Sequence, residues 1–170
     1  MSRAIAAVLA LTTAAAATAC TPEPSGGDVV VMGVGARVTA VVDGDTIDVR
    51  VAEGMERVRI IGLDTPELGR DGAADECYAQ EARAYVDDAL AGRTVTLFPD
   101  PTQDDVDQYG RLLRHVYVDE RSIALGVIED GAGREFTFDE PYGGQEAHLA
   151  AQDAARDDSR GLWGACDRSE

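Results

Sequence analysis

The feature that most constrains the fold is a run of strand-forming segments in the first half of the chain. Arg37–Val42, Thr46–Ala52 and Arg57–Leu63 are rich in β-branched residues and alternate between apolar and polar side chains, as half-buried strands do. Asp43 and Gly44 stand between the first two segments, and this dipeptide is a strong signal for a tight hairpin turn. Three strands joined by short turns are therefore expected.

The rest of the chain alternates further strands with helices. The hydrophobic period becomes helical at Tyr78–Ala91, where Gly92 is a natural stop. Two more strands are expected at Arg93–Phe98 and Leu112–Val118, and two more helices at Ser122–Asp130 and Gly144–Asp157. Five strands, with helices inserted after the third and the fifth, favour a small barrel of the α+β class over a parallel sheet.

The N-terminus has the pattern of an export signal. A weakly positive start precedes Ala4–Ala19, an uncharged run that is too short to cross a bilayer and ends in small residues. Residues 1–19 are therefore predicted to be a signal peptide, residues 20–35 a flexible linker, and residues 36–167 the folded domain. The small residues before Cys20 resemble a bacterial lipoprotein signal, which predicts a lipidated Cys20 on the outer face of the cell membrane, or else plain secretion with Cys20 unmodified.

The cysteines fit an exported chain. If Cys20 takes lipid, Cys77 and Cys166 are the pair that remains, and an oxidising compartment allows them to form a disulfide. The alternative is two separate buried thiols.

The charge of the chain argues against an extended nucleic-acid surface. The formal net charge is −17, and all 15 basic residues are arginines. Binding to phosphates normally depends on many Lys and Arg contacts. An activity on nucleic acid would therefore have to come from a local site.

Such a site is suggested by acidic residues at the ends of the predicted strands. Asp45 begins the second strand, and Asp64 and Glu67 follow the third. Three carboxylates that converge repel one another and need a cation or basic partners. An oxygen-only ligand set indicates Ca²⁺ or Mg²⁺ rather than zinc. Arg59 and Arg111 supply planar forks that suit a phosphodiester.

Taken in order, three segments resemble the motifs of the staphylococcal nuclease (thermonuclease-like) family: Val42–Thr46, Arg59–Glu67 and Asp107–Arg111. The resemblance extends from about Arg37 to Trp163 and implies an OB-fold barrel. It implies Ca²⁺ bound by Asp45, Asp64 and the carbonyl of Thr65, with Glu67, Arg59 and Arg111 as the catalytic side chains. In that reading Glu67 orients or deprotonates the attacking water, and the two arginines hold the scissile phosphate.

The resemblance also implies the reaction. It predicts endonucleolytic cleavage of DNA, RNA or both to 3′-phosphate and 5′-hydroxyl ends, with the nucleotide against Tyr109, Phe136 and Phe138. The chain departs from the family pattern at Gln108, where a lysine is usual. A monomer without a protein partner is predicted. Three alternatives stay open: a binding module without catalysis, a surface protein that uses the metal for stability, and hydrolysis of another phosphodiester.

Overall fold

The computed structural model describes residues 32–166. The predicted signal peptide, Cys20 and most of the predicted linker lie outside these residues, so those predictions stay predictions. Within the described part of the chain, no helix is long and apolar enough to cross a membrane.

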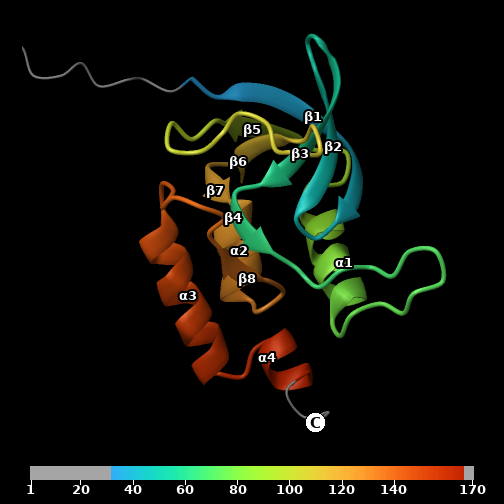
Figure 1. The fold of residues 1–170 in the computed structure, drawn as a ribbon, viewed down its shortest axis with the longest axis vertical. Helices are drawn as coiled ribbons and strands as arrows, with labels where there is room; N and C mark the ends of the chain where they lie inside the picture. The colour runs from blue at the N-terminus through green and yellow to red at the C-terminus, as the bar shows by residue number, and fades with distance from the viewer. Residues whose placement is uncertain (1–31, 167–170) are drawn as a thin grey trace, which may run out of the picture. The chain divides into compact units, whose positions relative to one another are not determined.

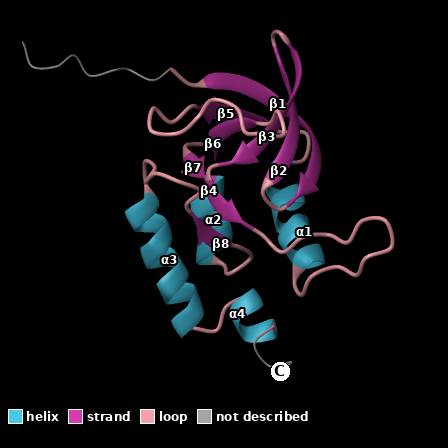
Figure 2. Ribbon diagram, in the orientation of Figure 1, coloured by secondary structure: helices cyan, strands magenta, loops and turns pink. Residues whose placement is uncertain are grey.

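Five strands form a closed barrel (Figures 1 and 2). They are β1 (Val34–Asp43), β2 (Thr46–Val51), β3 (Gly54–Ile60), β5 (Thr94–Phe98) and β6 (Leu112–Val118). Neighbours in the order β3-β2-β1-β5-β6 pair antiparallel, and a parallel pairing between β3 and β6 closes the ring. The prediction of a five-stranded barrel is therefore confirmed.

Alternating side chains of the strands make the core. Ile47 and Val49 on β2 are fully buried, and so are Val58 and Ile60 on β3. A strand presents every second residue to one face, so the apolar alternation of the sequence is the reason that these segments close around a common interior.

The predicted third strand is broken in the structure. It was expected to run through Leu63, but β3 ends at Ile60, and a separate β4 (Gly62–Asp64) pairs with β8 (Arg134–Phe136). Gly62 has a φ of +77°, a conformation that glycine adopts without steric cost. The chain turns there and leaves the barrel sheet, so Asp64 lies in the separate β4–β8 pair.

Helices pack on the barrel and beyond it. They are α1 (Ala79–Leu90), α2 (Ile123–Glu129), α3 (Gln145–Asp157) and the one-turn α4 (Leu162–Ala165). A two-residue strand, β7 (Arg121–Ser122), precedes α2, and the Ser122 hydroxyl caps α2 by accepting a hydrogen bond from the Leu125 amide at 3.3 Å. The three longer helices match the prediction, whereas β7 and α4 were not foreseen.

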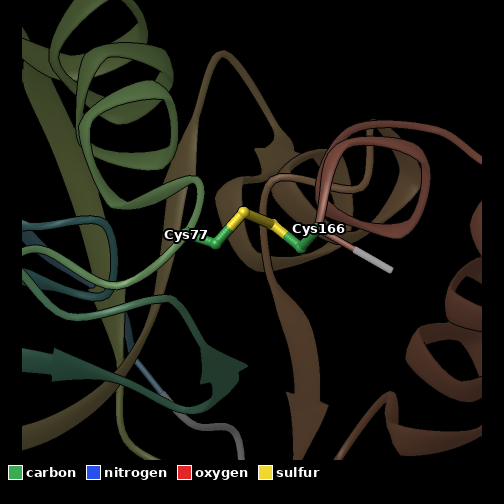
Figure 3. Close-up of a disulfide and its surroundings, with 2 residues drawn as sticks. All are labelled: Cys77 and Cys166. Carbon is green, nitrogen blue, oxygen red and sulfur yellow. A yellow bond between two sulfur atoms is a disulfide. The ribbon is translucent and has the colours of Figure 1, made fainter. Parts of the chain in front are cut away.

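A disulfide joins the two ends of the helical layer (Figure 3). Cys77 lies just before α1 and Cys166 directly follows α4, and their Cα atoms are 5.8 Å apart. The predicted bridge is confirmed, so the C-terminal turn is tied covalently to the segment that enters α1.

A buried carboxylate fixes the loop that follows β5. Asp100 Oδ1 accepts hydrogen bonds from the amide (2.9 Å) and hydroxyl (2.8 Å) of Thr102. Its Oδ2 accepts one from the Gly143 amide at 2.7 Å and lies 2.8 Å from His115 Nε2. Burial alone would raise the pKa of Asp100, but the hydrogen bonds from His115, Thr102 and Gly143 outweigh it and lower the pKa to about 2.

We expect Asp100→Asn to lower the free energy of unfolding at pH 7 by about 1 to 3 kcal/mol, the cost of disturbing charged, buried hydrogen bonds. Because the folded-state pKa of Asp100 is depressed, its contribution is present above the unfolded pKa and disappears as the pH falls from about 4 towards 2. Urea denaturation across this pH range should therefore show a weaker acid dependence in the variant. Equal dependence in both proteins would contradict this assignment.

Candidate functional site

The β1–β2 turn places one buried carboxylate. The Asp45 side chain accepts hydrogen bonds from the Thr65 amide (3.2 Å) and hydroxyl (3.3 Å) at Oδ2, and from the Thr46 hydroxyl (2.8 Å) at Oδ1. A Cβ on Gly44 would lie 2.8 Å from the Thr65 side chain, so only glycine lets the turn pack this closely. Asp45 is 1% exposed, and its orientation is fixed on both oxygens.

Arg59 joins this carboxylate to a second one. Its Nη2 lies 3.3 Å from Asp45 Oδ2 and 3.4 Å from Asp64 Oδ1. Its Nη1 donates to the carbonyls of Ile60 and Leu63, which frame the break between β3 and β4. Burial raises the pKa of Asp64 and the charge of Asp45 adds to this effect, while Arg59 opposes it. Two of the predicted metal ligands, Asp45 and Asp64, thus both contact one predicted arginine.

Glu67 begins the loop that leads to α1 and is held by its backbone. Its amide donates to Glu76 Oε2 at 3.0 Å, and its carboxylate is exposed. Partial burial raises the pKa of Glu67, as do the negative charges of Asp45 and Asp43, against the lowering effect of Arg70 and Arg59. The Glu67 carboxylate is therefore more basic than an ordinary glutamate.

Arg111 is oriented by an aspartate in its own segment. Asp107 accepts hydrogen bonds from the amides of Tyr109 and Arg111, both at 2.9 Å, and from Arg111 Nε at 2.6 Å. Burial opposes ionisation of Asp107, but the hydrogen bonds from Arg111 and Tyr109 lower its pKa. The guanidinium of Arg111 also lies over the Tyr109 ring, 5.3 Å from its centroid. Asp107 therefore holds the backbone of Tyr109 and both the backbone and the guanidinium of Arg111 in place.

The catalytic and substrate-binding candidates line a single hollow, which we name the aromatic cavity. It has a volume of about 600 Å³, and its lining includes Arg59, Glu67, Tyr109, Arg111, Phe136 and Phe138. The two phenylalanine rings are 6.4 Å apart, and Phe138 is 71% exposed. Exposed aromatic faces in a cavity can stack on a planar base. Asp45, Asp64 and Thr65 do not line the cavity, and the two aspartates are linked to it through Arg59.

The predicted metal ligands carry oxygen donors only. Among residues 32–166, no group of three or more His, Cys, Asp or Glu side chains is arranged to hold a metal ion. Asp45 and Asp64 with the Thr65 carbonyl offer oxygen atoms alone. Such a set suits a hard cation that keeps several ligands from water or substrate, and it does not suit zinc.

Sequence reasoning missed a second ion pair beside the site. Asp43 is 4% exposed, and its Oδ2 pairs with Arg70 Nη2 at 2.6 Å. Its Oδ1 has no hydrogen-bond partner among the described residues. The one available signal was the position of Asp43, two residues before Asp45 in the hairpin turn. No pattern in the sequence identifies Arg70, which lies in the loop between Glu67 and α1.

Comparison with known proteins agrees with this geometry. The family model described as staphylococcal nuclease homologue matches residues 57–165. A protein of Escherichia coli O157:H7, described as an uncharacterized endonuclease, is 32% identical over 132 residues, covering 77% of this chain and 78% of that protein. A thermonuclease of Staphylococcus hyicus is 29% identical over 127 residues, 75% of this chain and 74% of its own length.

A shorter match supports the same grouping. The endonuclease YncB of Bacillus subtilis (strain 168) is 32% identical over 100 residues, which are 59% of this chain and 47% of that protein. The barrel, the position of the site and the extent of these matches lead to one assignment. The chain belongs to the family of staphylococcal nuclease homologues.

Proposed function

We propose that this protein is a Ca²⁺-dependent endonuclease that hydrolyses phosphodiester bonds of DNA, RNA or both to 3′-phosphate and 5′-hydroxyl ends. The observation that carries the proposal is the position of Arg59. One guanidinium contacts both Asp45 and Asp64 and also lines the cavity that contains Glu67 and Arg111. Arg59 therefore links the acids proposed to bind the cation to the cavity that holds the proposed base and the second proposed phosphate-binding arginine.

Each side chain has a defined task in this proposal. Asp45, Asp64 and the Thr65 carbonyl hold the calcium ion, which when bound supplies positive charge that polarises the phosphate. Arg59 and Arg111 bind the phosphate oxygens and stabilise the charge that develops on them. Glu67 accepts a proton from the attacking water, for which its increased basicity is suited. Phe136 and Phe138 stack on the base of the bound nucleotide.

The internal ion pairs fit these tasks. Arg59 is held by two carboxylates and two carbonyls, and Arg111 by Asp107. Both guanidinium groups are therefore oriented before substrate arrives, and little rotamer freedom remains to be lost on binding.

We expect removal of calcium to abolish cleavage and to reduce thermal stability. Single-stranded DNA and RNA are incubated with the purified domain at low salt, with Ca²⁺ and then with excess chelator. An ion that binds only the folded state at about 100 times its Kd adds about 2.7 kcal/mol of stability, so chelation should lower the Tm.

Asp64→Asn should weaken both responses because it removes one anionic ligand. The matched control is Asp119→Asn, at an exposed aspartate that pairs with Arg93 on another part of the domain. A Tm response to calcium without cleavage of either polymer would favour the stabilising-metal alternative. Cleavage that continues unchanged in chelator would contradict the calcium dependence.

A further inference from the structure

A second hollow adjoins the aromatic cavity. We name it the arginine cavity; it has a volume of about 750 Å³ and shares Glu67, Tyr109 and Arg111 with its neighbour. Beyond these shared residues, its lining includes Arg57 from β3 and Arg70 from the loop before α1. The two cavities thus meet at the residues proposed to act on the scissile phosphate.

The charges of the two cavities differ. The lining of the aromatic cavity contains two arginines, Arg59 and Arg111, and five acids: Glu67, Asp104, Asp107, Asp139 and Glu140. The lining of the arginine cavity contains three arginines, Arg57, Arg70 and Arg111, and three acids: Asp43, Glu67 and Glu76. A polyanion that crosses the scissile position is therefore repelled less on the side of the arginine cavity than on the side of the aromatic cavity.

Both additional arginines are held in place and still accessible. Arg70 pairs with the buried Asp43 through Nη2, and its side chain is 65% exposed. Arg57 makes two bonds to Asp48, at 2.7 and 3.0 Å, and its side chain is half exposed. Each guanidinium is anchored by one carboxylate, while its remaining N–H groups have no acceptor among the described residues. An anchored fork with unused donors is suited to a phosphate group.

We propose that the arginine cavity is a second phosphate-binding site, which takes the phosphate next to the scissile one through Arg70 and Arg57. This inference rests on the proposed nuclease function. The strand then runs from Arg70 across Glu67 and Arg111 and places one nucleotide against Phe136 and Phe138. The excess of acids around the aromatic cavity disfavours further phosphates beyond that nucleotide. The preferred substrate is a single strand that continues on the arginine side of the scissile bond.

The test compares two substrates in Ca²⁺: a dinucleoside monophosphate, which contains one phosphodiester, and a single-stranded octanucleotide. Arg70→Gln should lower kcat/KM for the octanucleotide by about 3- to 10-fold, in line with the loss of one exposed ionic contact. It should leave kcat/KM for the dinucleoside monophosphate within about 2-fold. The slope of log kcat/KM against log salt for the octanucleotide should become shallower by about 0.7, the value for one single-strand phosphate contact.

Two further variants sharpen the comparison. Arg57→Gln should reproduce the length-selective loss. Arg93→Gln removes an exposed arginine that also pairs with an aspartate, Asp119. It should leave kcat/KM unchanged for both substrates. If Arg70→Gln lowers kcat/KM equally for both substrates, Arg70 acts on the loop that contains Glu67 and not on a phosphate. The inference is then overturned. Unchanged octanucleotide kinetics overturn it as well.

The failure of the nuclease proposal gives a different result. It appears as no cleavage of either substrate by the wild-type protein. In that event, binding of a labelled octanucleotide, measured by fluorescence anisotropy, still tests the second phosphate-binding site. Weaker binding by Arg70→Gln than by Arg93→Gln supports the site, and equal binding overturns it.

Discussion

Replacing Glu67 with Gln is expected to lower kcat by about 10²- to 10⁴-fold, the range typical of losing a positioned general base. Gln is nearly isosteric with Glu but cannot accept the proton of the attacking water at neutral pH. The hydrogen bond from the residue 67 amide to Glu76 involves the backbone, so it survives the substitution. The KM and the Tm should therefore change little.

The measurement is steady-state cleavage of a single-stranded oligonucleotide in Ca²⁺, together with a thermal melt of each protein. Glu53→Gln is the matched control, because it removes the same charge from an exposed turn between β2 and β3. A kcat for Glu67→Gln within 10-fold of the wild type would contradict the role of Glu67 as a base. A comparable loss in Glu53→Gln would instead indicate a general charge effect.

Removing the disulfide is expected to have the largest effect on stability. In the Cys77→Ser, Cys166→Ser double variant we expect the free energy of unfolding to fall by about 2 to 5 kcal/mol, since the bridge restricts the unfolded chain over a long loop. For a domain of this size the Tm should fall by roughly 10 °C. The activity at 25 °C should persist, because Asp45, Asp64 and Arg111 are held by contacts inside and around the barrel.

The comparison is between the wild type, the wild type in excess reductant and the double variant. The two forms without the bridge should melt together and below the oxidised protein. If all three melt at the same temperature, the bridge adds no stability. If activity disappears with the bridge at 25 °C, then the segment from Glu67 to Cys77 depends on it for its catalytic conformation.

Most of the barrel could be predicted from local patterns. The alternation in Thr46–Val51 and the Asp43-Gly44 turn are visible in the sequence and define the first hairpin. The break at Gly62 was not predictable in the same way. A glycine inside an apolar run can stay in a strand or turn out of it, and the pairing of β4 with β8 decides between them. That pairing depends on residues far away in the chain.

The candidate site, like the fold, could be predicted only in part. Asp45, Asp64, Glu67, Arg59 and Arg111 could be proposed because their types and spacing have a chemical meaning together. The pair between Asp43 and Arg70 could not, since Arg70 lies in a loop without periodicity and its partner is set by tertiary structure. Phe136 and Phe138 were proposed as a pair. The approach of Phe136 to Arg59, whose guanidinium is 5.9 Å from the ring centroid, is due to the same β4–β8 pairing.

The parallel pairing of β3 with β6 determines when in folding the site can exist. Val58 pairs with Leu112 and Arg59 with Leu113, although β4, α1 and β5 lie between these strands in the sequence. Contacts so distant in sequence form late, because the entropy of closing the intervening chain must first be overcome. A polypeptide that ends before β6 has the acidic hairpin and Arg59, yet it lacks the strand that brings Arg111 beside them. Fragments that end before β6 should therefore lack catalytic competence, even though they contain Asp45 and Arg59.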